Sequence, residues 1–325
     1  METNNDRSEN TLSTLDSQLS ITNISKSYGD IKALKNISLE VSEGELFGLI
    51  GPDGAGKTSL FRILTTLLLP DSGSATVNGF DVVSDYKKIR NKIGYMPGKF
   101  SLYQDLTVEE NLNFFATLFN TSIQENYDLI KDIYQQIEPF KNRRAGKLSG
   151  GMKQKLALSC ALIHRPTVLF LDEPTTGVDA VSRKEFWQML KSLKAQGITI
   201  FVSTPYMDEA TLCERIALIQ SGTILSVDTP ENIMNGMKEQ FYAIRSENMG
   251  LLISDLRAHE LVKTVFAFGE NHHITFKNSS DENQKRLLEY LNTKSHQTIV
   301  FEPIIPTIED CFIHLMQHQD ATHSN

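Results

Sequence analysis

A glycine-rich stretch, GPDGAGKTS, has the composition and spacing of a phosphate-binding loop. It occupies residues 51–59, fits G-x-x-x-x-G-K-[ST], and lies between an apolar run (ELFGLIG) and a helical pattern. Glycines let the backbone wrap a phosphate, and backbone N–H groups converge where the helix begins. Lys57 would then reach the β- and γ-phosphates, and the Thr58 hydroxyl would bind Mg²⁺. We therefore expect the phosphate site to consist of Gly51, Pro52, Asp53, Gly54, Ala55, Gly56, Lys57, Thr58 and Ser59.

Two adjacent carboxylates end a second apolar run, VLFLDEP (168–174). Asp172 would hold Mg²⁺, usually through water, and Glu173 could polarise an attacking water. Such a pair also occurs at solvated strand ends, but its place downstream of a phosphate loop favours catalysis. We expect Lys57, Asp172 and Glu173 to be catalytic, with Thr58 and Asp172 as the metal-binding residues.

A third segment, LSGGMKQKLALSCAL (148–162), has Ser149, Gly150 and Gly151 directly before a helical pattern. The N–H groups and dipole of a helix start can meet a second anion there. An ordinary capped helix would use the same residue types. One phosphate-binding loop is enough for one nucleotide, so a second anion-binding segment in the same chain needs an explanation.

Apolar periodicity predicts the elements that hold these segments. ELFGLIG, TVLFLDEP and ITIFVST read as strands buried on both faces, and residues 20–50 alternate as strands do. Helical spacing follows residue 58, recurs in SRKEFWQMLKSLKAQG, and covers most of residues 101–140. Strands that alternate with helices predict an α/β fold with a mostly parallel sheet.

The pattern changes after DTPENIMNG, which predicts a second domain. From Phe241 the order is strand, helix, two strands, helix, strand and a final helix, typical of a small ferredoxin-like α+β appendage at 238–325. His272 and His273 flank the expected hairpin, and we expect them on the surface. The main domain spans 19–235, with a helical insert at about 95–165, and the polar residues 1–18 form a disordered tail.

Composition excludes several classes of protein. The chain has 325 residues, of which 40% are hydrophobic and 22% charged, which suits a soluble globular protein. A net charge of −8 argues against a nucleic-acid binder that relies on a basic surface. No apolar stretch approaches the roughly 18 residues that span a bilayer. Cys160, Cys213 and Cys311 form no C-x-x-C pair, so we expect buried thiols.

These motifs and their order resemble the ATP-binding cassette (ABC) family, the nucleotide-binding subunits of ABC transporters, over residues 19–235. The resemblance implies a P-loop NTPase fold in which two cassettes pair head to tail. Each ATP is then held by the phosphate loop of one cassette and the LSGG segment of the other, so Ser149, Gly150 and Gly151 bind nucleotide. It also implies that Tyr28 in SKSYGD stacks on adenine, although an exposed turn tyrosine would look the same. TTGVDA (175–180) places Asp179 at the dimer interface.

Two positions depart from the family pattern. Where the family has a glutamine that contacts Mg²⁺ and water and senses the membrane subunit, YMPGKFSLY has Gly98. Where the family has a histidine that contacts the γ-phosphate, VSTPYMDEA has Pro205, which offers no donor and no ionisable group. These departures predict that the chain's own site binds ATP and cleaves it slowly.

The stretches FSLYQDLTVEENLNFFA and GKLSGGMKQKL look most like cassettes of ABC-2-type drug and efflux exporters. That resemblance implies an ATP hydrolase that uses ATP and Mg²⁺, lies on the inner face of the cell membrane, and drives separate ABC-2-type permease subunits. We expect it to be the degenerate half of a heterodimer with a second cassette. One alternative is a self-pairing slow ABC ATPase. Another is a soluble ABC protein that acts on ribosomes or DNA, although such proteins typically carry tandem cassettes or a long coiled-coil insert.

Overall fold

The chain folds as two compact units, which divide after Asp228. This computed structural model describes residues 17–323, with side chains up to residue 317. The predicted tail, residues 1–18, lies outside the described residues except for Ser17 and Gln18, which begin strand β1. The N-terminal unit ends at Asp228, and the second unit begins at Thr229.

A six-stranded sheet with the order β10-β9-β3-β8-β7-β6 forms the centre of the N-terminal unit. Every neighbouring pair is parallel except β9 and β10. The mostly parallel sheet that the sequence predicts is therefore confirmed. Its strands are β3 (Leu46–Ile50), β6 (Ile93–Met96), β7 (Val168–Asp172), β8 (Thr199–Thr204), β9 (Arg215–Gln220) and β10 (Thr223–Asp228).

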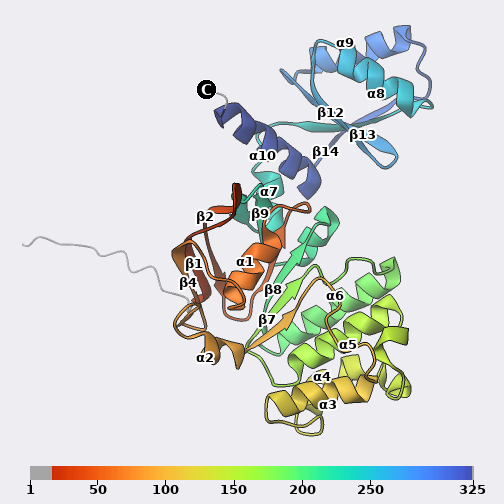
Figure 1. Cartoon of the computed structure of the whole chain (residues 1–325). Coiled ribbons are helices and arrows are strands. Elements are labelled where there is room, and N and C mark those ends of the chain that lie inside the picture. The colour runs from red at the N-terminus through yellow and green to blue at the C-terminus, as the bar shows by residue number, and fades with distance from the viewer. Residues whose placement is uncertain (1–16, 324–325) are drawn as a thin grey trace, which may run out of the picture. The chain divides into compact units, whose positions relative to one another are not determined.

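A second, antiparallel sheet has the order β2-β1-β4-β5. Helix α1 packs between the two sheets (Figure 1), because its buried residues and those of both sheets form one hydrophobic core. Phe61 of α1 stacks on Phe201 of β8, with ring centroids 4.8 Å apart. The elements are β1 (Ser17–Tyr28), β2 (Ile31–Ser42), α1 (Lys57–Leu64), β4 (Ser72–Val77), β5 (Phe80–Asp81) and α2 (Tyr86–Arg90).

The predicted helical insert lies between β6 and β7 and is drawn in yellow to green in Figure 1. Helical spacing covers most of residues 101–140, but the second helix of this stretch ends at Tyr134 and a separate 3₁₀ turn follows around Pro139. The remaining elements of this unit are α3 (Val108–Leu118), α4 (Tyr127–Tyr134), η1 (Glu138–Phe140), η2 (Ala145–Lys147), α5 (Gly150–Leu162), α6 (Ala180–Ala195) and η3 (Met207–Leu212).

Strand register brings three loops to one edge of the central sheet. Ile50 at the end of β3 pairs with Thr204 at the end of β8. Asp172 at the end of β7 pairs with Ser203 of β8. Because parallel strands end at the same edge, the segments that follow these three strands are neighbours, and ligands bind at such an edge in α/β folds.

The second unit contains a four-stranded antiparallel sheet with the order β12-β13-β11-β14. The chain order from β11 to β14 is β-α-β-β-α-β, which is the ferredoxin-like arrangement. Helices α8 and α9 contribute to a separate core with one face of this sheet. The elements are α7 (Pro230–Asn235), β11 (Phe241–Arg245), α8 (Met249–Ala258), β12 (Val262–Phe268), β13 (Asn271–Phe276), α9 (Asp281–Thr293), β14 (Val300–Ile304) and α10 (Ile308–His323).

Candidate nucleotide-binding site

The glycine-rich loop links β3 to α1, as the sequence predicts, and its shape requires glycine at both ends. A Cβ on Gly51 would lie 2.1 Å from the carbonyl oxygen of Ile219. Gly56 has a φ of +107°, and a Cβ there would lie 2.5 Å from the Ala33 carbonyl oxygen. The loop therefore passes close to neighbouring backbone while leading into the helix N-terminus, a geometry that suits a phosphate.

Lys57 is the first residue of α1 and is 3% exposed. Its ammonium donates to the carbonyl oxygens of Gly51 (2.7 Å) and Pro52 (2.9 Å). It also forms an ion pair with the Glu173 carboxylate at 3.0 Å. The structure thus brings together the loop lysine and the second carboxylate of the acidic pair, which lie far apart in sequence.

The acidic pair is held by Ser203 of the neighbouring strand. The Ser203 hydroxyl donates to the Asp172 carboxylate at 2.7 Å and accepts from the Glu173 N–H at 3.0 Å. Glu173 has a φ of +51°, in the left-handed region that few non-glycine residues adopt. Such strain persists where surrounding contacts hold it, and it aims the Glu173 side chain at Lys57. The carboxylate of Asp172 also adds to the effect of burial, which raises the pKa of Tyr95 to about 12.

The two positions that depart from the family pattern both lie at this edge. A Cβ on Gly98 would come within 3.0 Å of the Asp172 carbonyl oxygen and 3.8 Å of the Glu173 Cβ. Pro205 directly follows Thr204, whose carbonyl oxygen accepts from the Gly51 N–H at 3.2 Å. Each position is therefore adjacent to the acidic pair or the phosphate loop.

Tyr28 lies beside the far end of the phosphate loop. Its side chain is 46% exposed, and its hydroxyl is 3.3 Å from the hydroxyl of Ser59. This contact joins the end of β1 to α1. The expected stacking of this exposed ring on adenine stays a prediction.

The LSGG segment meets a different part of the chain. Ser149 caps α5 by accepting from the Met152 N–H at 3.4 Å. A Cβ on Gly151 would lie 2.8 Å from the Ser182 hydroxyl, so this turn packs against the start of α6. Asp179 caps α6 by accepting from the N–H groups of Val181 (3.1 Å) and Ser182 (3.0 Å). The LSGG and TTGVDA segments thus form one surface.

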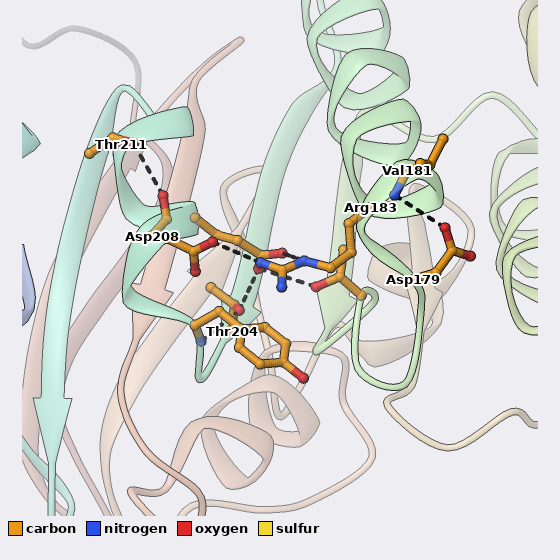
Figure 2. A network of polar contacts seen from close by, with 9 residues as sticks. Asp179, Val181, Arg183, Thr204, Asp208 and Thr211 are labelled. Carbon is orange, nitrogen blue, oxygen red and sulfur yellow. Dashed lines mark hydrogen bonds and ion pairs between the residues drawn. The ribbon is translucent and has the colours of Figure 1, made fainter. Parts of the chain in front are cut away.

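A network around Glu209 was not apparent from the sequence. Figure 2 shows Arg183, Thr204 and Asp208 from this part of the structure. Glu209 is 1% exposed and pairs with Arg183 of α6 at 3.1 Å. The hydroxyls of Thr204 and Thr175 donate to the same carboxylate, at 2.5 Å and 3.1 Å. In the sequence, Glu209 looked like an ordinary acidic residue at a helix start. The only feature of the sequence that pointed to its role was its position, five residues after the end of a buried strand.

The residues present fit a Mg²⁺-nucleotide. Asp172 is a carboxylate that is 2% exposed at the end of a strand, and Thr58 follows Lys57 in the first turn of α1. Among residues 17–323, no group of three or more His, Cys, Asp or Glu side chains could hold a metal on its own. Mg²⁺ typically binds through one or two protein oxygens, water and substrate phosphates, and the Thr58 hydroxyl and the Asp172 carboxylate are oxygens of that kind.

Comparison with known proteins agrees with this geometry. The family model for the ABC transporter matches residues 34–176. The Nod factor export ATP-binding protein I of Sinorhizobium fredii is 34% identical over 310 residues, an alignment that covers 92% of this chain and 86% of that protein. The chain belongs to the ABC transporter family.

Two further ABC proteins show how far the similarity extends. The probable multidrug ABC transporter ATP-binding protein YbhF of Escherichia coli is 44% identical over 223 residues. That alignment covers 68% of this chain but only 39% of YbhF, so the chain spans well under half of that relative. A dimeric structure of a bacterial ABC transporter cassette is 29% identical, with a TM-score of 0.59, and covers 65% of this chain and 98% of that cassette. Within residues 17–323, no helix combines the length and apolarity needed to cross a bilayer.

Proposed function

We propose that the chain binds Mg-ATP in the 51–59 loop and powers an exporter whose membrane-spanning subunits are separate proteins. The meeting of Lys57, Asp172 and Glu173 at one sheet edge carries this proposal. Lys57 exchanges its contacts with loop carbonyls and Glu173 for the β- and γ-phosphates. Thr58 and Asp172 would hold Mg²⁺, which would neutralise charge on the phosphates. Tyr28 stacks on the adenine.

Glu173 then acts as the base that orients the attacking water. Once Glu173 is released from Lys57, its carboxylate lies next to the γ-phosphate position, while Ser203 holds the Glu173 backbone. Gly98 and Pro205 supply neither of the polar contacts that the family pattern has at these positions. Losing one such preorganised donor costs about 3 kcal/mol, or about 10²–10³ in rate. The chain's own site therefore binds ATP and turns it over slowly.

The second half of each site comes from another cassette. Gly150 and Gly151 begin α5. Their helix-start N–H groups would serve a nucleotide held by the partner. This chain keeps its LSGG segment while lacking both switch contacts. Such an asymmetry favours a heterodimer in which the partner cassette retains the glutamine and histidine. The partner's ATP is then hydrolysed, and the ATP in this chain's loop stabilises the dimer.

A groove of about 560 Å³ next to position 98 suits the membrane subunit. It runs from Met96 and Pro97 to Phe115 and His164, between the strand β6 and the helical insert. Because Pro97 directly precedes Gly98, a cytoplasmic helix of the permease seated here would lie beside the acidic pair. This docking holds the chain at the inner face of the cell membrane. The relatives named for multidrug transport and Nod factor export support an ABC-2-type exporter.

The ATPase activity of the reconstituted pair, with its permease subunits, tests the heterodimer. Gly150→Asp should abolish activity, because its carboxylate repels the partner's γ-phosphate. A Cβ at Gly150 comes no closer than 3.4 Å to the Gly177 carbonyl oxygen, so the fold accommodates the side chain. Glu173→Gln should reduce activity much less, because it falls in the slow site.

The matched control is Gly250→Asp, which adds the same charge at an exposed glycine of α8. It should leave the ATPase activity unchanged. If Glu173→Gln is as damaging as Gly150→Asp, the two sites contribute equally and a self-pairing cassette replaces the heterodimer.

A further inference from the structure

Glu209 is a buried carboxylate that joins three elements of the N-terminal unit. One carboxylate oxygen accepts from the hydroxyls of Thr204 at the end of β8 and Thr175 in the loop after β7. The other accepts from the Nε of Arg183 in the first turn of α6. A carboxylate that is 1% exposed and fully supplied with donors holds its neighbours firmly, since each contact is strong in such surroundings.

Each of these contacts leads towards the nucleotide site. Thr204, which precedes Pro205, makes two further hydrogen bonds. Its hydroxyl accepts from the Tyr206 N–H at 3.1 Å, and its carbonyl oxygen accepts from the Gly51 N–H at 3.2 Å. Thr175 lies two residues after Glu173. The backbone at the end of β8 therefore depends on a hydroxyl that Glu209 holds.

Arg183 secures Glu209 from the other side. Its second nitrogen donates to the exposed carboxylate of Asp208 at 3.0 Å, and its guanidinium lies 4.4 Å from the centroid of the Tyr206 ring. Figure 2 shows Arg183 reaching from α6 towards Thr204 and Asp208. Asp179 caps the same helix, so the network spans from the Asp179 segment to the phosphate loop.

We propose that Glu209 is a positioning residue that, through Thr204 and Thr175, sets the γ-phosphate end of the nucleotide site. Pro205 has no N–H, so it cannot fix this segment by a backbone donor of its own. Instead, Glu209 fixes Thr204, and Thr204 fixes the start of the phosphate loop at Gly51. The inference rests on the proposed binding of ATP in that loop. It predicts that the network favours ATP over ADP, because the two nucleotides differ only at the γ-phosphate.

The test measures the dissociation constants of Mg-ATP and Mg-ADP for the full chain by calorimetry. Glu209→Gln keeps the shape of the side chain but removes its charge, and Thr204→Val keeps the shape of the strand but removes the hydroxyl. Both should weaken ATP binding by about tenfold while changing ADP binding by less than about twofold. Thr204→Ser, which restores the hydroxyl, and Asp208→Asn, which alters only the exposed partner of Arg183, should bind like the unchanged chain.

A purely structural role would weaken ATP and ADP binding in parallel, and that result would overturn the inference. Unchanged ATP affinity in Thr204→Val would overturn it as well, even if Glu209→Gln failed to fold. If the unchanged chain does not bind ATP, the proposed function itself fails, which is a separate result from a lost preference for ATP.

Discussion

In the proposed function, the single residues Gly98 and Pro205 limit how fast the site hydrolyses ATP. Both lie beside the acidic pair or the phosphate loop, yet neither offers a side-chain donor. The double change Gly98→Gln with Pro205→His should raise the ATP turnover of the purified chain by at least about tenfold, because preorganised contacts to the γ-phosphate are worth about 10²–10³ in rate.

Phosphate release measures this turnover, and a Glu173→Gln change added to the double variant should return it to background. The gain is limited at position 98, where a new Cβ meets the Asp172 carbonyl oxygen at 3.0 Å. Brisk turnover by the unchanged chain would show that the two departures matter little.

His164 should make the stability of the N-terminal unit depend on pH. Burial lowers the pKa of His164, while its hydrogen bond to the Ile93 carbonyl oxygen (2.9 Å) opposes that shift. The unfolded chain, with a pKa near 6.5, therefore takes up this proton first as the pH falls. Its contribution to stability is complete above pH 6.5 and is lost between that pH and the lowered folded pKa.

Urea unfolding at pH 7 and pH 5 tests this dependence, with the single tryptophan, Trp187, as the fluorescent probe of this unit. His164→Phe keeps a ring against Phe119, on which His164 stacks at 3.8 Å, but removes the titration. The variant should lose less stability between the two pH values than the unchanged chain. Equal losses would show that His164 does not carry the pH dependence.

At the scale of elements, α1 depends on the aromatic cluster between the sheets. Phe61 is fully buried, stacks on Phe201, and meets the ring of Phe170 edge to face. Phe61→Ala should lower the free energy of unfolding by about 3–5 kcal/mol, because it removes the transfer energy of the ring and leaves a cavity. Urea unfolding followed by Trp187 fluorescence measures the change.

Phe114→Ala is the matched control, because Phe114 lies on α3 with 41% of its surface exposed. It should cost less than about 1 kcal/mol. A similar loss in both variants would mean that the core between the sheets is not what holds α1.

The strand–loop–helix segments were predictable because each carries its own local signal. The 51–59 loop has glycines at the positions that the fold requires, and the apolar runs before Gly51 and Glu173 mark buried strands. Contacts between distant segments were not predictable in this way. Neither the ion pair of Lys57 with Glu173 nor that of Arg183 with Glu209 leaves a pattern in the sequence, since both depend on strand order.

The prediction that His272 and His273 lie on the surface was wrong, for the same reason. Both are buried, because the sheet of the second unit has helices against both faces. His272 contacts the Met249 carbonyl oxygen at the start of α8, and His273 contacts the Asp310 carboxylate of α10 at 2.9 Å. The hairpin register sends adjacent side chains to opposite faces. Two adjacent histidines in the sequence do not indicate that helices cover both faces of the sheet.

At the scale of the whole molecule, each unit has a hydrophobic core of its own. We therefore expect the chain to tolerate loss of residues 229–325. A shortened chain that ends at Asp228 should fold and bind Mg-ATP within about twofold of the full chain, because units with separate cores can fold alone. Calorimetry on the two chains measures this. Loss of folding or of ATP binding would show that the second unit completes the first.

If this ABC chain holds ATP through the 51–59 loop, as we propose, then removal of the Lys57 ammonium should weaken ATP binding. The lysine carries a buried charge at the start of α1, and in the proposed function this charge meets the β- and γ-phosphates. Equilibrium binding of Mg-ATP should be measured for the full chain, for Lys57→Ala, and for the control Lys184→Ala, which removes an exposed lysine from α6. Lys57→Ala should weaken binding at least about tenfold, since charge-assisted contacts to phosphate contribute about 1.5–3 kcal/mol, while Lys184→Ala should not change it. Equal ATP affinity in the unchanged chain and in Lys57→Ala would contradict the account.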